Sequence, residues 1–210
     1  MSLHLSSWKQ PDQGALFVVT GASGTGKTTL VKEALRVIPG LQFSVSATTR
    51  SPRRGERQGV DYHFVSRTRF DSMVQSDEML ESAEVYGNHY GTPRVPIEKA
   101  FKDGVSTLLD IDTQGAEQVR SAMPESVTIF ILPPSLKAIE TRLRIRSTDA
   151  PEVIARRIKD AKIQMEQCGT FDYLVVNDDL ASAHDQFQAI IIAELLRKSR
   201  HESLVEQFRG

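Results

Sequence analysis

Short runs of apolar residues alternate with helical patterns along most of the chain. The run at 15–20 (ALFVVT) predicts a strand that is buried on both faces of a sheet. Glycines follow it, and apolar residues then recur at helical spacing over 28–37. Similar apolar runs occupy 105–111, 127–132 and 173–176, and helical patterns follow them at about 114–122, 135–144 and 182–197. This alternation predicts an α/β fold whose core is a parallel sheet flanked by helices.

Two polar, arginine-rich stretches interrupt the alternation. In residues 43–97, segments of mixed polarity at 60–65 and 79–90 predict strands, so we interpret this stretch as an inserted, mainly antiparallel subdomain. In residues 142–157, Pro151 is suited to the first turn of a second helix at about 152–167, which predicts a short helical lid. The expected core is then 15–42, 98–141 and 158–200, with flexible ends at 1–14 and 201–210.

The composition is that of a globular protein, with 40% apolar and 25% charged residues among 210. The formal net charge of −1 argues against a broad basic surface, so neither nucleic acid nor membrane is expected as a partner. The single cysteine, Cys168, cannot form an intramolecular disulfide, and we expect a reducing, cytoplasmic location. No apolar run reaches the roughly 18 residues of a membrane span, and residues 1–13 lack the apolar segment of a signal peptide.

Residues 21–28 (GASGTGKT) satisfy the phosphate-binding P-loop pattern, with a predicted strand before them and a predicted helix after them. The glycines let backbone N–H groups converge on phosphate oxygens, and the helix N-terminus adds partial positive charge. Lys27 supplies a cation for the β- and γ-phosphates, and the Thr28 hydroxyl can ligate Mg²⁺. The alternative is a glycine-rich turn that only reverses the chain, which the flanking strand and helix disfavour. The motif predicts nucleoside triphosphate binding without naming the acceptor.

A second basic segment, residues 46–57 (SATTRSPRRGER), carries four arginines. The planar fork of arginine matches the paired oxygens of a phosphate, so this segment could clamp a dianionic phosphate. Taken alone, a solvated loop whose arginines pair with acids such as Glu56 and Asp61 is an equal alternative. Tyr62 and Tyr90 favour the phosphate site, because each can donate a hydroxyl while its ring packs beneath.

Through these and further motifs the chain resembles the guanylate kinase family, over about residues 16–196. The motifs are the phosphate loop, SVSATTRSPRRGERQGVDYHF at 44–64, ESAEVYGNHYGT at 81–92, LLDIDTQG at 108–115, the arginine-bearing lid and VVNDD at 175–179. The resemblance implies a P-loop NTPase-type fold with a GMP-binding insertion at 43–97. It also implies transfer of the γ-phosphoryl group of ATP to GMP or dGMP, with Mg²⁺ accompanying ATP.

The resemblance implies a role for individual residues. The GMP phosphate would be bound by Arg50, Arg53, Tyr62 and Tyr90, and guanine by Ser46, Glu81, Thr92 and Asp112. The residues expected to bind ATP are Gly21, Ala22, Ser23, Gly24, Thr25, Gly26, Lys27, Thr28, Thr29 and Asn177. The residues expected to be catalytic are Lys27, Arg142, Arg146 and Arg157. Asp110 ends an apolar strand, and it is expected to lie near the Mg²⁺ ion without binding it directly.

The chemistry of guanine agrees with this assignment. Its Watson–Crick edge presents two donors, N1–H and the N2 amine, beside the O6 acceptor, so a carboxylate can accept from both donors while a hydroxyl faces O6. Adenine presents an acceptor where guanine has a donor, and the unpaired carboxylate can then discriminate by about 10⁴-fold. The accepting phosphate is largely ionised at pH 7, so no general base is needed.

Two other functions fit parts of the pattern. A kinase of the same superfamily that acts on another phosphorylated acceptor, such as a ribose bisphosphate, would leave the guanine-binding residues idle. A guanylate-kinase-like interaction module would have lost the ATP machinery, which Lys27, Thr28 and the lid arginines retain. The chain departs from the family pattern at Ala22, where proline is common, and at Ser147, where glycine is common and the change could stiffen the lid hinge.

Overall fold

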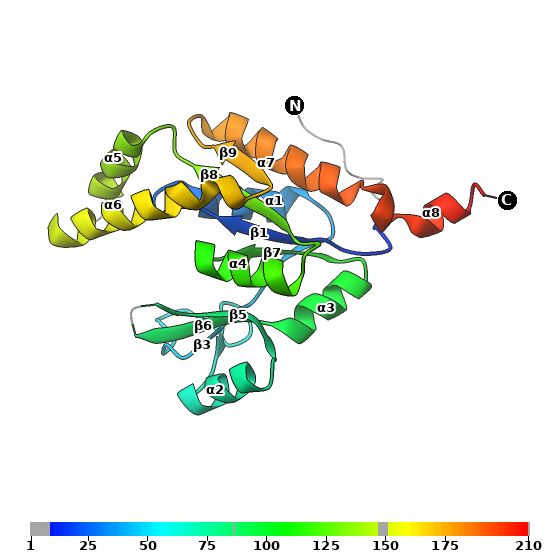
Figure 1. Cartoon of the computed structure of the whole chain (residues 1–210), viewed down its shortest axis with the longest axis horizontal. Helices are drawn as coiled ribbons and strands as arrows, with labels where there is room; N and C mark the ends of the chain where they lie inside the picture. The colour runs from blue at the N-terminus through cyan, green and yellow to red at the C-terminus, as the bar shows by residue number, and fades with distance from the viewer. Residues whose placement is uncertain (1–8, 86, 147–150, 210) are drawn as a thin grey trace.

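The computed structural model describes residues 9–85, 87–146 and 151–209. Its centre is a parallel sheet, sheet A, with the strand order β2-β7-β1-β8-β9 (Figure 1). The predicted parallel core is therefore confirmed. The strands of sheet A are β1 (Leu16–Thr20), β2 (Leu41–Phe43), β7 (Ser106–Asp110), β8 (Val127–Leu132) and β9 (Tyr173–Val176). Strand β2 was not predicted, because three residues with one buried side chain are too short to show a pattern.

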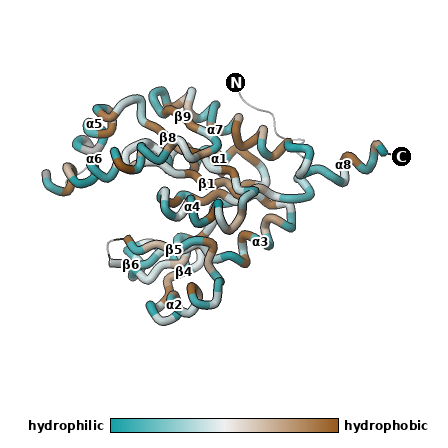
Figure 2. Tube along the Cα trace, viewed as in Figure 1, coloured by the Kyte–Doolittle hydropathy of each residue, from teal (hydrophilic) through white to brown (hydrophobic). Residues whose placement is uncertain are grey.

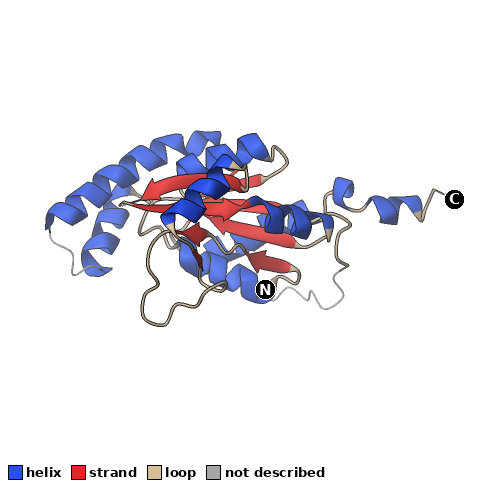
Figure 3. Ribbon diagram, turned by 90° about the horizontal axis from the view of Figure 1, so that it is seen from below, coloured by secondary structure: helices blue, strands red, loops and turns tan. Residues whose placement is uncertain are grey.

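Helices cover both faces of sheet A. Figure 3 shows the strands lying between two layers of helices. On one face, Phe17 and Val19 pack against helices α1 (Lys27–Val37) and α7 (Leu180–Leu195). On the other face, Leu16 and Val18 pack against α3 (Arg94–Lys102) and α4 (Thr113–Ala122). Successive residues of β1 thus enter opposite halves of the core, which explains its continuous apolar run.

The insertion forms a second sheet, sheet B, with the strand order β4-β3-β6-β5. Its strands are β3 (Ala47–Thr48), β4 (His63–Phe64), β5 (Met79–Val85) and β6 (Asn88–Pro93). The pairs β3–β6 and β5–β6 are antiparallel and β3–β4 is parallel, so the sheet is mainly antiparallel as predicted. Helix α2 (Arg67–Gln75) was not predicted, although Ser66 caps its N-terminus and Phe70 and Met73 are buried at helical spacing.

The predicted lid at 142–157 falls within helices α5 (Leu136–Arg146) and α6 (Pro151–Glu166), which are followed by a short helix η1 (Gln167–Thr170). The two helices lie side by side at one end of the molecule (Figure 1). In Figure 2, α6 alternates between hydrophilic and hydrophobic residues along its length. Ile139 of α5 and Ile154 and Ala161 of α6 form an apolar cluster with Ala22, which seats both helices on the phosphate loop. Ser147 lies outside the described residues.

Both ends of the described chain hydrogen-bond to the fold, where the sequence predicted flexible ends at 1–14 and 201–210. Helix α8 (Glu202–Glu206) follows a short helix η2 (Lys198–Arg200). The Ser203 N–H donates to Asp12 Oδ2 at 2.7 Å, and the buried Arg200 guanidinium donates to the Gly14 carbonyl at 2.5 Å. Such pairings join residues about 190 positions apart in sequence, so no local pattern predicts them. Within the part of the chain that is described, no helix is both long and apolar enough to cross a membrane.

Candidate active site

The phosphate loop leaves the carboxyl end of β1 and enters α1, whose first residue is Lys27. Gly21 and Gly26 adopt positive φ angles of 151° and 91°, a region that side chains rarely occupy. A Cβ at Gly21 would overlap the Ile131 carbonyl, and one at Gly26 would overlap the Asn177 amide. Both glycines are therefore required by the close approach of neighbouring strands to the loop.

Two hydrogen bonds that involve Thr25 stabilise the conformation of the phosphate loop. The Thr25 side chain is fully buried, and its hydroxyl donates to the Ala22 carbonyl at 2.8 Å. The Asn177 side-chain amide donates to the Thr25 carbonyl at 2.7 Å. Asn177 follows β9, so the end of another strand supports the loop. A contact between Asn177 and adenine, which the resemblance implies, stays a prediction.

The loop borders a cavity of about 470 Å³ at the carboxyl ends of β1 and β7. Every expected ATP-binding residue from Gly21 to Thr29 lines this cavity, together with Asp110, Ile111, Asp112 and Gln164. Gln164 comes from α6, and no sequence signal marked it. The ends of parallel strands are where ligands bind in sheets of this kind.

A partly buried ion pair, Lys27 with Asp110, lines this cavity. Lys27 Nζ is 3.8 Å from Asp110 Oδ1, and it donates a hydrogen bond to the Gly21 carbonyl at 2.5 Å. Burial raises the pKa of the Asp110 carboxyl, and the positive charge of Lys27 opposes that rise. The lysine is thus held by two oxygens in a position from which it faces the cavity with the loop amides.

Two of the expected catalytic arginines reach the phosphate loop region from the lid. Arg157 of α6 donates to Ser23 Oγ at 2.6 Å. Arg142 of α5 donates to the Asn177 carbonyl at 3.1 Å. The Arg146 side chain lies outside the described part of the structure. Helices α5 and α6 therefore each place one arginine beside the phosphate loop or the Asn177 segment that supports it.

The expected GMP phosphate site is a cluster around Arg50. Its guanidinium donates to both carboxylate oxygens of Glu56, at 3.0 and 2.9 Å, and lies 5.4 Å from the centre of the Tyr62 ring. The Tyr62 and Tyr90 rings meet edge to face at 6.0 Å. Hydrogen bonds to Glu56 and, less strongly, to Tyr90 raise the pKa of Arg50, so the guanidinium is permanently charged.

The sequence offered a second interpretation of this segment, a loop whose arginines pair with acids such as Glu56. The Arg50–Glu56 pair shows that such pairing occurs for one of the four arginines. Glu56 Oε2 also accepts from the Arg53 backbone N–H at 2.7 Å, which folds the loop around the carboxylate. The Arg53 residue itself is exposed. Glu56 and the Ser51 carbonyl accept three hydrogen bonds from the five N–H groups of Arg50, and a weaker hydrogen bond joins Arg50 to Tyr90, so at least one N–H group remains for a ligand.

The expected guanine site is formed by neighbouring strands of sheet B. Glu81 of β5 pairs with Thr92 of β6, and the Thr92 hydroxyl donates to Glu81 Oε1 at 2.7 Å. Thr92 is fully buried, and Glu81 is only 6% exposed. Burial raises the pKa of Glu81 to about 7; the Thr92 hydrogen bond opposes this rise, and the charge of Asp112 adds to it. A carboxylate held with so little solvation is suited to accept N–H donors from a ligand.

Strand alternation places the two clusters on one face of sheet B. Tyr90 and Thr92 are two residues apart on β6, so both side chains point to the same side. Ser46 directly precedes β3, and its carbonyl accepts from the His63 N–H at 2.8 Å. The structure therefore places Glu81, Thr92 and Tyr90, three of the residues expected to bind GMP, on one face of the insertion.

Asp112 connects this face with the phosphate loop. It lines the loop cavity, and its negative charge acts on Glu81. Its carboxylate also caps α4 by accepting from the Gly115 N–H at 2.8 Å. Burial is the main cause of the raised pKa of Tyr62; the charges of Tyr90, Glu56 and Asp110 add to the rise, and the charge of Arg50 opposes it. Asp110 and Asp112, at the end of β7 and just after it, therefore lie between the phosphate loop and the residues expected to bind GMP.

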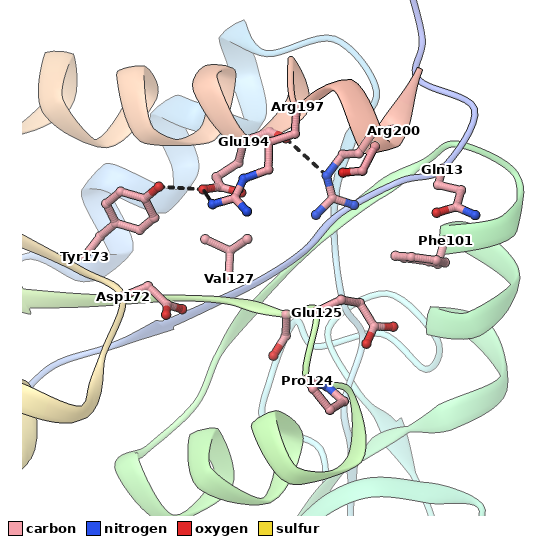
Figure 4. Close-up of a pocket in the computed structure, with 12 residues that line it drawn as sticks. Gln13, Phe101, Pro124, Glu125, Val127, Asp172, Tyr173, Glu194, Arg197 and Arg200 are labelled. Atoms are coloured by element: carbon pink, nitrogen blue, oxygen red, sulfur yellow. Dashed lines mark hydrogen bonds and ion pairs between the residues drawn. The ribbon is translucent and has the colours of Figure 1, made fainter. Parts of the chain in front are cut away.

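A cavity of about 720 Å³ at the other end of sheet A is excluded as the reaction site. It is lined by Val127 and Tyr173, the first residues of β8 and β9, so it lies at the amino ends of the strands. Figure 4 shows Tyr173 and Arg197 converging on Glu194, whose carboxylate is 2% exposed and accepts from the Tyr173 hydroxyl at 2.5 Å. The Tyr173 hydroxyl and the Arg197 guanidinium both bind the Glu194 carboxylate, which joins β9 to the C-terminal end of α7.

Comparison with known proteins identifies the family. A family model described as guanylate kinase matches residues 13–194. The chain belongs to the guanylate kinase family. It is 49% identical over 188 residues to a guanylate kinase of Neisseria meningitidis serogroup A, covering 90% of this chain and 92% of that one. It is 46% identical over 188 residues to a guanylate kinase of Carboxydothermus hydrogenoformans, with the same coverage.

A solved structure agrees with these sequence relatives. The crystal structure of guanylate kinase from Anaplasma phagocytophilum superposes with a TM-score of 0.76 at 34% identity, covering 95% of this chain and 96% of that chain. The guanylate kinase fold therefore includes both sheets and the lid helices described above. The expected fold class and family are confirmed.

Proposed function

We propose that this guanylate kinase family member transfers the γ-phosphoryl group of ATP to GMP, giving ADP and GDP, and that it also accepts dGMP. The observation that carries the proposal is the buried Glu81–Thr92 pair, which lies on the same face of sheet B as the Arg50–Tyr62–Tyr90 cluster and opposite the phosphate loop. A buried carboxylate and hydroxyl for the base, together with a basic cluster for the phosphate, match the chemistry of GMP. In this assignment residues 43–97 bind GMP and residues 142–157 form the lid.

Guanine recognition follows from the state of Glu81. Its Oε1 already accepts from Thr92, and the carboxylate is nearly free of water, so the N1–H and N2 donors of guanine replace missing solvation. Binding of two N–H donors favours the charged carboxylate, which the empty pocket disfavours. Adenine would place a lone pair against the carboxylate and leave it unsatisfied. Ser46 and Asp112 complete the proposed set of guanine contacts. A missing 2′-hydroxyl changes none of these contacts, which supports the use of dGMP.

The transfer step needs positioning and charge stabilisation more than proton removal. The GMP phosphate is mostly ionised at pH 7 and can attack the γ-phosphorus directly. The phosphate of GMP would be held by Arg50, Arg53 and the two tyrosine hydroxyls. Lys27, Arg142, Arg146 and Arg157 would neutralise charge on the phosphoryl oxygens during transfer, when Arg142 and Arg157 exchange their present oxygen partners for phosphate oxygens. Lid closure would exclude water and suppress ATP hydrolysis.

The residues present fit a magnesium ion bound together with ATP. Thr28 is exposed in the first turn of α1 and lines the loop cavity, and Asp110 lines the same cavity with its carboxylate 3.8 Å from Lys27 Nζ. Hydroxyl and carboxylate oxygens are ligands that Mg²⁺ prefers, and Mg²⁺ is commonly held by one or two protein groups plus nucleotide phosphates. Thr28 would bind the ion and Asp110 would orient its water molecules. When bound, Mg²⁺ supplies charge neutralisation for the β- and γ-phosphates.

We also propose that the reaction is a step of purine nucleotide metabolism in the cytoplasm. Cys168 is a free thiol and is partly accessible, which fits a reducing compartment.

A monophosphate panel tests the proposed reaction. With ATP and Mg²⁺, the release of ADP is measured for GMP, dGMP, AMP, CMP, UMP and a ribose bisphosphate. We expect GMP and dGMP to be turned over at least about 10³-fold more efficiently than AMP, by the cost of leaving a buried carboxylate unpaired. Equal use of AMP would exclude the guanine site. Turnover of the ribose bisphosphate alone would favour the alternative acceptor, and phosphopeptide binding without any turnover would favour an interaction module.

A further inference from the structure

Strand β5 is the last strand of sheet B, and its free edge faces α4 (Figure 1). In an antiparallel pair, the N–H and C=O of one residue point to the same side, alternately toward the partner strand and away from it. Ser82 has both groups directed to the free edge. It directly follows Glu81, whose side chain forms the proposed guanine contact.

The side-chain amide of Gln118, on α4, satisfies both edge groups of Ser82. The Ser82 N–H donates to Gln118 Oε1 at 3.1 Å, and Gln118 Nε2 donates to the Ser82 carbonyl at 3.2 Å. A primary amide carries one acceptor and two donors in a plane, so it pairs with a backbone residue as a neighbouring strand would. Gln118 thus joins the insertion to a helix of the core with a two-bond clamp.

The same face of α4 touches the Glu81 carboxylate. Gly115 and Gln118 are three residues apart, and residues at this spacing lie on one side of a helix. A Cβ at Gly115 would be 3.0 Å from Glu81 Oε2 and 3.4 Å from Asp112 Oδ1. The Gly115 N–H in turn donates to Asp112 Oδ1. Within one turn of α4, Gly115 therefore leaves space for the Glu81 carboxylate, and Gln118 hydrogen-bonds to the next residue of β5.

The clamp spans a region that is not continuously packed. A cavity of about 730 Å³ lies between β5 and α4, and it is lined by residues that include Glu81, Ser82, Gln118 and Ser121. On the core side, Leu80 of β5 packs in one apolar cluster with Ala116 and Val119 of α4, and polar contacts add to this packing on the side of the cavity. The Gln118 clamp supplies two such contacts one residue away from Glu81.

We propose that Gln118 is a positioning residue for guanine recognition, which sets the location of Glu81 relative to α4, and that Gly115 is glycine because the Glu81 carboxylate occupies the place of a side chain. Gln118 has no role in the phosphoryl transfer itself. This inference rests on the proposed function, since it assigns Glu81 to guanine.

Gln118→Met and Gln118→Ala test the clamp. Methionine keeps the length and most of the volume of glutamine but has no amide, so it removes both hydrogen bonds without opening the helix surface. The matched control is Ser121→Ala on the same helix, because the Ser121 hydroxyl bonds only within α4 to the Glu117 carbonyl. Steady-state kinetics with GMP and ATP varied separately, GMP affinity by calorimetry and thermal unfolding are measured for each variant.

We expect both Gln118 variants to raise the KM and Kd for GMP about five- to twentyfold, the range that corresponds to losing one or two solvent-accessible hydrogen bonds. The KM for ATP and the melting temperature should stay close to wild type, as should every value for Ser121→Ala. Gly115→Ala adds a methyl group against Glu81 in a helical position, so it should weaken GMP binding at least tenfold without loss of helix stability.

Three results would overturn the proposal. They are unchanged GMP affinity in both Gln118 variants, a parallel rise of the KM values for GMP and ATP, and a fall in melting temperature that accounts for the loss of activity. The wild-type protein is assayed first. If it does not phosphorylate GMP, the proposed function has failed; if it does and the variants match it, only the clamp has failed.

Discussion

Replacing the buried carboxylate by its neutral analogue, Glu81→Gln, should stabilise the unliganded protein at high pH and impair GMP binding. Glu81 is 6% exposed, and burial raises its pKa to about 7 from an ordinary value of 4.5. Ionising this group therefore costs more in the folded protein than in the unfolded chain. Glutamine keeps the length and the acceptor oxygen for Thr92 but carries no charge, so it does not incur that cost.

The magnitude follows from proton linkage. Below pH 4.5 the carboxyl is protonated in both states and contributes no difference. Between pH 4.5 and 7 the folded state retains the proton that the unfolded state has lost, so the wild-type protein loses stability as the pH rises. Above pH 7 the loss is complete, and the difference between the two pKa values corresponds to about 3 kcal/mol.

Urea unfolding of the two proteins without nucleotide, at pH 5 and pH 8, measures this effect. The free energy of unfolding of Glu81→Gln should exceed that of wild type by about 3 kcal/mol at pH 8, and by less than about 1 kcal/mol at pH 5. The matched control is Glu117→Gln on α4, which makes the same substitution at an exposed position. A gap that is equal at the two pH values, or one that grows toward acid, would refute the account of Glu81.

Other outcomes follow from the same site. Without its cation, Lys27→Ala should lose at least about 10³-fold in kcat for ADP release, and a wild-type rate would exclude the phosphate loop as the ATP site. Arg50→Lys cannot pair with both oxygens of Glu56, so its KM for GMP should rise about tenfold while that for ATP stays unchanged. Asn177→Ala removes the support of Thr25, so chemical denaturation should show a loss of about 1–2 kcal/mol, and the KM for ATP should rise. The kcat/KM for GMP should increase with pH through about 7 as Glu81 ionises. In Glu81→Gln, only the part of the increase that is due to ionisation of the GMP phosphate should remain.

The central sheet and its helices could be predicted because each element carries its own periodic signal. Strand β1 is buried at every position and apolar from Leu16 to Val19, because it is covered on both faces, and the strand at 127–132 was predicted with the bounds that β8 has. The insertion was harder. The segment predicted as a strand at 60–65 contains only the two-residue strand β4, because a loop that wraps Glu56 and Asp61 occupies most of it. Helix α3 begins at Arg94, inside the stretch expected to belong to the insertion.

The expected site residues could be predicted from sequence motifs, whereas the residues that contact or support them were found only in the structure. Lys27, Glu81 and Thr92 stand in recognisable patterns, and the structure places them in the phosphate loop and in one strand pair. Gln164 and Gln118 are polar residues on amphipathic helices, where most such residues only face solvent. Their positions near the site depend on which turn of the helix meets the cavity or the strand edge. That information is three-dimensional, and a single sequence does not contain it.

One short segment after β7 organises both halves of the site. Asp110 ends the strand and lies 3.8 Å from Lys27, while Asp112, two residues later, caps α4. From that cap the helix runs to Gly115 beneath the Glu81 carboxylate and to the amide that holds Ser82. Misplacement of reacting groups by about 1 Å can cost on the order of 10² in rate. The Glu81 carboxylate and Lys27 both contact residues of this one strand–helix junction. Glu81 contacts the helix and Lys27 contacts the strand, so a displacement of α4 would change the proposed guanine binding first and leave the Lys27–Asp110 pair in place.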